Sequence, residues 1–175
     1  MLKFIKKCLL IVVAIGLAYG IYVNVINAKT VDYTKPSQTK SYPKLKNHPN
    51  AWIDVSIRKQ RVYIKDGSRV LYTMYCSTGL NNSTPTGTFS RSIENEKGTT
   101  FYNANLNEGA NYWTSFKNHG EYLFHTVPIK QDGTYDKAEA KKLGKVASHG
   151  CIRLTIPDAK WIYKNIPVGT KVVVE

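Results

Sequence analysis

The chain has 175 residues, 42% of them hydrophobic, which is enough for one domain with a buried core and a short appendage and excludes a chain disordered throughout. Its 25 Lys and Arg outnumber its 12 Asp and Glu, and the formal net charge of +13 favours anionic partners such as nucleic acid, wall polymers or membrane lipids. Because the lysines are scattered and no nucleic-acid-binding motif is present, we expect an anionic cell envelope as partner and no nucleic acid.

The N-terminal segment, residues 1–28, has the pattern of a membrane anchor or a signal peptide. Three lysines precede a run of 21 uncharged residues, 8–28. As a helix this run would span roughly 30 Å at ~1.5 Å per residue, about the thickness of a bilayer core. The basic flank places the N-terminus inside and the rest of the chain outside the cell. The length favours a retained single-pass helix in the cell membrane, whereas cleavage after Ile26-Asn27-Ala28 would release a secreted protein.

Residues 29–50 are polar, contain Pro36, Pro43 and Pro49, and show neither helical nor strand periodicity. This composition is typical of a linker, which would hold the following domain, residues 51–175, away from the membrane.

The domain begins with a predicted β-meander. Residues 52–58, 60–65 and 70–76 alternate apolar and polar side chains, as half-buried strands do, and Asp66-Gly67-Ser68 supplies a turn. A loop rich in Gly, Pro, Ser and Thr follows, and residues 88–91 are predicted to form another strand.

Residues 92–120 are polar but carry several aromatic side chains. They allow two interpretations, a long surface excursion held by aromatic anchors or a wall of a functional cleft. The next predicted strand, residues 122–127, contains His125.

The C-terminal part contains an insertion, two short helices and a last strand. The insertion, residues 129–143, includes a turn and a helix predicted over 136–143. A second helix is predicted over 157–165, with Thr155 as a possible cap, and residues 171–175 form the final strand. The domain is therefore predicted to be mainly β with a few short helices.

The segment 148–154, Ser-His-Gly-Cys-Ile-Arg-Leu, carries the candidate chemistry. A cysteine attacks carbonyls as the thiolate, so Cys151 needs a nearby base, and imidazole is the side chain that acts as one near neutral pH. Gly150 allows a tight turn and a close approach of backbone amides to a bound oxyanion.

The cysteines do not suggest a disulfide framework. Cys8 lies in the apolar N-terminal run, which leaves Cys76 and Cys151 in the domain. A Cys76–Cys151 bridge stays open and would block the nucleophile, whereas Cys76 alone is typical of a small apolar residue in a strand. Cys151 with His149 and His125 makes a possible zinc set, but no pairing motif supports it, and we expect neither a metal nor a cofactor.

Several of these segments resemble a known family. The septet 148–154, with a histidine in an upstream strand, resembles the signature of the L,D-transpeptidases, the YkuD-type domain of bacterial cell-wall enzymes. Residues 77–79 and 84–89 resemble the family's upstream loop, and residues 168–174 its closing strand. The resemblance covers about residues 51–174 and implies an L,D-transpeptidase-type β-sandwich.

The resemblance implies a role for each site residue. Cys151 is the nucleophile and His125 the general base, oriented by a backbone carbonyl on its other ring nitrogen. His149 and Ser148 shape the site, and the amides of Gly150 and Cys151 form the oxyanion hole.

Arg153 has a less certain role, either binding a substrate carboxylate or raising the thiolate fraction. The 23 positions between His125 and Ser148 exceed the family spacing, and we place the extra length in a loop over 133–143. If that placement is wrong, His149 is the alternative base.

The implied reaction is acyl transfer between peptidoglycan stem peptides. Cys151 attacks the carbonyl of an L-residue, a D-amino acid leaves, and an amine of a second stem resolves the thioester as a 3→3 cross-link. Two alternatives remain open: an L,D-carboxypeptidase that uses water on the same site, and a non-catalytic wall-binding module with an inert Cys151.

Overall fold

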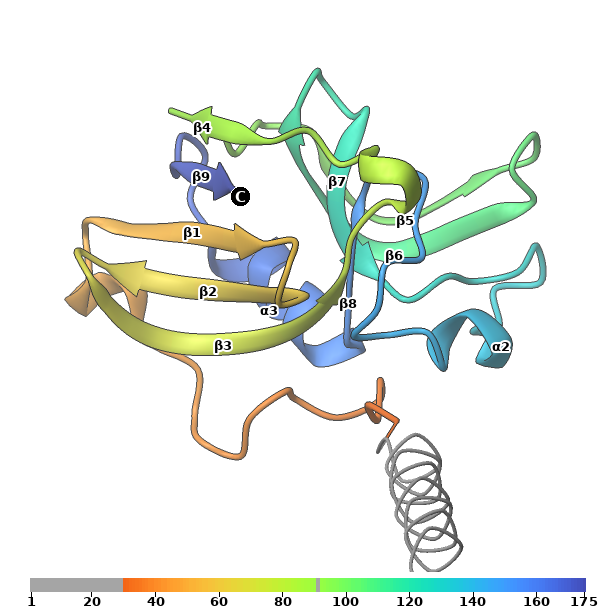
Figure 1. The fold of residues 1–175 in the computed structure, drawn as a ribbon, viewed down its shortest axis with the longest axis horizontal. Coiled ribbons are helices and arrows are strands. Elements are labelled where there is room, and N and C mark those ends of the chain that lie inside the picture. Colours follow the sequence, from red (N-terminus) through yellow and green to blue (C-terminus); the bar gives the residue numbers. More distant parts are fainter. Residues whose placement is uncertain (1–29, 91) are drawn as a thin grey trace, which may run out of the picture. The chain divides into compact units, whose positions relative to one another are not determined.

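The computed structural model describes residues 30–90 and 92–175 of the chain (Figure 1), and residues 31–175 form one compact unit. The predicted membrane segment, residues 1–28, lies outside the described residues. Within the part of the chain that is described, no helix is both long enough and apolar enough to span a bilayer.

Nine strands form one curled sheet in the order β4-β9-β1-β2-β3-β8-β7-β6-β5 (Figure 1). The pairs β1–β9 and β7–β8 are parallel and the other neighbours are antiparallel. The strands are β1 (Ala51–Ser56), β2 (Arg61–Asp66), β3 (Arg69–Ser77), β4 (Gly87–Phe89), β5 (Lys97–Asn103), β6 (Glu108–Lys117), β7 (Tyr122–Thr126), β8 (Ile152–Leu154) and β9 (Val172–Val174).

The prediction of a mainly β domain with a few short helices is confirmed. The end of β3 continues into the second half of the sheet through the pairs Cys76↔Leu154 and Ser77↔Arg153. The two halves of the curled sheet are therefore joined by backbone hydrogen bonds, and both contribute to one core.

The meander β1–β2–β3 forms as the alternation predicts. In β2, Val62 and Ile64 are fully buried, while the residues between and beside them are only partly covered. This period-2 burial turns one face of the strand toward the core.

Helix α3 (Ile156–Asn165) closes the core on the side of β6, β7 and β8. The hydroxyl of Thr155 caps its N-terminus by accepting a hydrogen bond from the Asp158 amide, and a proline stands in the first turn, as the sequence predicts. Trp161 and Ile162 are the buried side chains of its apolar face. Helix α2 (Lys137–Ala140) is shorter than predicted, and 3₁₀ turns lie at η1 (Leu45–Asn47) and η2 (Leu80–Asn82).

Most of residues 92–120 form the β5–β6 hairpin, so they are not the long surface excursion of the first interpretation. Strand β6 has ten residues and buries Phe116 in the core. The strand is irregular at Tyr112, whose φ of 52° is positive. Apolar and polar side chains therefore do not alternate regularly along this part of the sequence.

Residues 31–50, assigned to a linker from their sequence, pack against the domain. Tyr42 stacks on the rings of Tyr72 and Trp161, with centroids 4.6 and 5.3 Å away. Its hydroxyl donates to the buried carboxylate of Asp158, which also accepts from the Ser37 hydroxyl. These residues form no long helix or strand, as expected, yet they are part of the compact unit.

Candidate active site

The parallel pairing of β7 with β8 brings the two candidate catalytic residues into one region. His125 lies within β7, and Cys151 directly precedes β8. In the register of the pair, Phe124 is opposite Ile152 and His125 is opposite Arg153. Two segments that are 26 positions apart in sequence are thereby adjacent in the fold.

Cys151 and His125 both line one cavity of about 150 Å³. The remaining lining comes from four places: the β5–β6 hairpin, the turn before β7, β7 itself and the segment before Cys151. These residues are Phe101, Asn103, Leu106, Glu108, Gly120, Glu121, Leu123, Ser148 and His149. The hairpin thus forms a wall of the cavity, in agreement with the second interpretation of residues 92–120.

The imidazole of His125 is buried and held in one orientation. Only 2% of the residue is exposed, and Nδ1 lies 2.6 Å from the carbonyl oxygen of Thr126. Because a carbonyl only accepts, Nδ1 carries the hydrogen and the neutral ring keeps Nε2 as an acceptor. Burial, and next the charge of Arg153, lower the pKa of His125 to about 4, so the ring is neutral at pH 7.

The thiol of Cys151 is also neutral in this state. It is half-buried, and its Sγ lies 3.6 Å from the carbonyl oxygen of Glu121. Burial raises the pKa of Cys151 to about 11. In the resting site both the thiol and the imidazole are therefore neutral.

The backbone around Gly150 can be formed only by glycine. Its φ of 148° lies in the region that side chains disfavour, and a Cβ there would lie 3.1 Å from both Ser83 O and a ring carbon of Tyr122. The hydroxyl of Ser148 accepts from the Gly150 amide at 3.1 Å and donates to the Cys151 carbonyl at 2.5 Å. The Gly150 amide, which was assigned to the oxyanion hole, thus donates to Ser148 in this structure.

The loop after β3 supports this turn. Thr84 is buried; its hydroxyl accepts from the Gly79 amide at 2.7 Å and donates to the Gly150 carbonyl at 2.8 Å. Further backbone bonds join Leu80 to Ser148. The loop that resembled the family's upstream motif therefore acts as a support for the nucleophile.

Arg153 is committed to ion pairs. Only 2% exposed, it places one terminal nitrogen 2.7 Å from Glu108 and the other 2.8 Å from Glu139. Both terminal nitrogens of the guanidinium are thus engaged in ion pairs, whereas the buried Nε has no hydrogen-bond partner among the described residues. The Arg153 side chain links β6, β8 and α2. Its positive charge also acts to lower the pKa of Cys151, against the larger effect of burial.

Comparison with known proteins identifies the fold and the family. The model of the L,D-transpeptidase catalytic domain matches residues 50–174. YciB of Bacillus subtilis strain 168, provisionally named an L,D-transpeptidase, is 54% identical over 152 residues, covering 84% of this chain and 76% of YciB. This chain belongs to the L,D-transpeptidase family.

Solved structures of L,D-transpeptidases share the fold. One from Mycobacterium smegmatis superposes with a TM-score of 0.56 at 19% identity, covering 72% of this chain and 58% of that one. LdtMt1 in complex with imipenem gives a TM-score of 0.57 at 21% identity, covering 72% and 59%. Family membership makes this chain an enzyme of the L,D-transpeptidase type, with a cell-wall substrate.

The structure also places the other residues that the sequence of this L,D-transpeptidase singled out. His149 is exposed and lines the same cavity as Cys151. Cys76 is buried in β3, and both it and Cys151 are free thiols. Sequence reasoning missed Glu108 and Glu139, because isolated Glu residues give no signal until the fold places them beside Arg153. Thr84 lies in the loop that resembled the family, but only the fold shows its hydrogen bond to Gly150.

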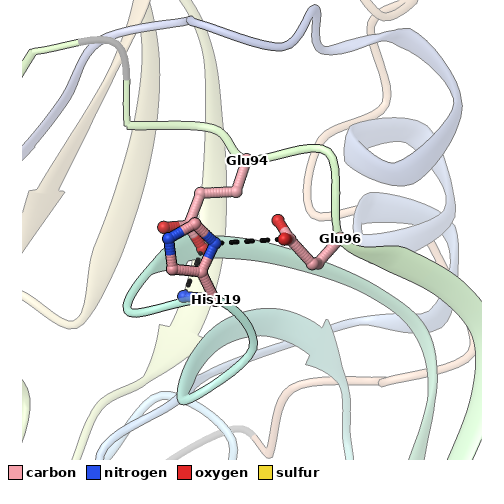
Figure 2. Close-up of side chains that lie close together, drawn as sticks. All are labelled: Glu94, Glu96 and His119. Carbon is pink, nitrogen blue, oxygen red and sulfur yellow. Dashed lines mark hydrogen bonds and ion pairs between the residues drawn. The ribbon is translucent and has the colours of Figure 1, made fainter.

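Outside the cavity, Glu94, Glu96 and His119 converge from two loops (Figure 2). Their potential ligand atoms lie within 4.8 Å of one another, a spacing that suits a metal ion. Hydrogen bonds already account for the arrangement: His119 Nδ1 lies 3.1 Å from Glu96, and Glu94 accepts from the His119 amide and from the hydroxyl of Ser115. The carboxylates raise the pKa of the exposed His119.

Replacing Thr84 with valine should weaken the support beneath the nucleophile. The Gly79 amide would lose its acceptor in a buried site, at a cost of about 1–3 kcal/mol. Urea unfolding measures this loss, and Thr86→Val, at an exposed position in the same loop, is the control. Equal stability of the two variants would show that the bond from Gly79 contributes nothing.

The buried imidazole of His125 should make stability fall in acid. The pKa of His125 is about 4 in the folded chain against an ordinary 6.5, so the unfolded chain binds the extra proton between these values. The free energy of unfolding should therefore drop by about 3 kcal/mol from pH 7 to pH 4 through this residue alone. Subtracting the same curve for His125→Gln isolates the effect, and an unchanged slope in that variant would contradict it.

Proposed function

We propose that the chain is a cysteine-dependent peptidoglycan L,D-transpeptidase that forms 3→3 cross-links between stem peptides through a thioester. Family membership supports the reaction class. The observation that carries the mechanism is that Cys151 and His125 line one cavity, with Nδ1 of the histidine held by the Thr126 carbonyl.

In the first half-reaction, Sγ of Cys151 attacks the carbonyl that follows an L-residue, and Nε2 of His125 takes the thiol proton as the S–C bond forms. Because thiol and imidazole start neutral, proton removal accompanies the attack. The Cys151 amide is the candidate donor to the oxyanion, since the Gly150 amide is bound to Ser148. The C–N bond then breaks, and the imidazolium gives its proton to the departing D-amino acid.

In the second half-reaction, an amine of another stem attacks the thioester and passes a proton to His125. The S–C bond breaks, the thiol is restored with that proton, and the new amide is the cross-link. The low pKa of the buried imidazole makes its protonated form a strong acid, which favours protonation of the leaving amine.

Cys151→Ala should abolish acyl transfer, and His125→Gln should slow it about 10²–10⁴-fold. Intact-mass analysis after exposure to a tetrapeptide stem should show an acyl adduct on the wild type and none on Cys151→Ala. Cys76→Ala keeps the nucleophile and should keep the adduct. Imipenem, which is bound in the LdtMt1 structure, should add its mass to the same cysteine.

The products separate the alternatives. Cross-linked dimers in the presence of an acceptor amine support a transpeptidase, and tripeptides alone indicate an L,D-carboxypeptidase. A Cys151 that resists both acylation and alkylation would leave only a wall-binding module.

We further propose that residues 1–28 anchor the enzyme in the cell membrane with the domain outside. The uncharged run of 21 residues after three lysines supports this orientation. The full chain should remain in the membrane fraction after a carbonate wash, whereas a chain starting at residue 29 should not. A mature N-terminus at Lys29 in the soluble fraction would instead establish a cleaved signal peptide.

A further inference from the structure

A groove extends from the nucleophile cavity along the insertion of residues 129–143. Its volume is about 350 Å³, and it shares Leu106, Glu108 and His149 with the cavity that contains Cys151. The two spaces therefore adjoin at these three residues.

The insertion supplies one wall of the groove and is firmly attached. Its helix α2 contributes Glu139, which pairs with the buried guanidinium of Arg153. Ala140 and Leu143 are buried in a small apolar cluster with Val127. The wall is thus part of the folded domain, with a fixed place beside the active site.

Most of the charged groups that line the groove are already neutralised by one another. Glu108 and Glu139 face Arg153, and Glu139 also pairs with Lys142 at 2.5 Å. Asp136 accepts hydrogen bonds from two backbone amides at the start of α2. These groups have little remaining capacity for a ligand.

Lys130 remains uncommitted. It is exposed, and among the described residues its ammonium group makes no ion pair and no hydrogen bond. Its charge helps to lower the pKa of Asp132 and Asp136, whose oxygens are bound to backbone amides. Lys130 thus gives the groove a positive group without an ion-pair partner among the described residues, which suits a carboxylate.

Two large apolar side chains complete the groove. Leu80 is 48% exposed and Leu106 is 50% exposed, and both line it. Exposed leucines that gather at one concave site are typical of ligand contact. The groove thus offers an apolar rim and a cation beside a nucleophile.

We propose that this groove is a binding subsite for an acidic peptide, in which Lys130 pairs with a carboxylate and Leu80 and Leu106 contact aliphatic groups. The inference rests on the proposed function, because it assigns the groove to one of the two stem peptides that must meet at Cys151. A donor and an acceptor stem both carry this chemistry, and kinetics distinguish them.

Binding is measured on the full chain in detergent, with Cys151→Ala to prevent turnover and a tetrapeptide stem as the probe. Adding Lys130→Ala should weaken binding about fivefold at low salt, the effect of one partly solvated ion pair. The loss should shrink at 0.5 M salt and should be absent for the stem with amidated carboxylates. Lys137→Ala removes the same charge from the insertion, outside the groove, and should change nothing.

Kinetics with an intact Cys151 then identify the occupant. A slower acylation by the stem, with unchanged alkylation by iodoacetamide, assigns the groove to the donor. An unchanged acylation with a smaller share of cross-linked product assigns it to the acceptor. Leu106→Ala should shift the same step as Lys130→Ala.

Equal affinities of Lys130→Ala and Lys137→Ala for the free-carboxylate stem would overturn the subsite. That result is independent of the chemistry, since binding is measured without the nucleophile. Absence of an acyl adduct on the wild type would instead contradict the proposed function and leave the binding result to decide the groove.

Discussion

The active site depends on the parallel pairing of β7 with β8. This pairing places His125 opposite Arg153 and brings Cys151 to the edge of the same cavity. Successive side chains of a strand point to opposite faces, so the pairing of β7 decides on which face His125 lies. The Thr126 carbonyl then holds the imidazole in one orientation. The nucleophile lies outside the strand and needs a separate support, which the loop after β3 provides through Thr84 and Gly79.

Burial determines the protonation states of Cys151 and His125. It raises the pKa of the thiol and lowers that of the imidazole, and both changes favour neutral forms. Arg153 lies next to both groups, but its charge is balanced by Glu108 and Glu139. Removing one partner of such a buried pair is costly because the other charge is left without compensation. The arrangement therefore supports the proton transfer of a neutral pair more readily than a permanent thiolate.

The parts of the chain outside the nucleophile segment are tied to it through packing. Val31 and Tyr33, which lie before the domain expected from the sequence, pack against the cluster of Val127, Ala140 and Leu143. The same insertion reaches Arg153 through Glu139. The segment that follows residues 1–28 is thus in contact with the insertion that forms a wall of the groove.

The sequence by itself determined the elements whose signals are local. Alternating side chains predicted the meander, Thr155 and a proline predicted the start of α3, and the septet at 148–154 indicated the family. The tertiary structure alone decided the pairing of β7 with β8, the attachment of residues 31–50 and the β5–β6 hairpin, whose period is broken at Tyr112.

It also decided which polar groups stay free. The Gly150 amide and the two terminal nitrogens of Arg153 have partners, while the ammonium group of Lys130 has none among the described residues. Hydrogen bonds and ion pairs between distant residues depend on distances of about 3 Å, and only the folded chain fixes distances between residues far apart in sequence.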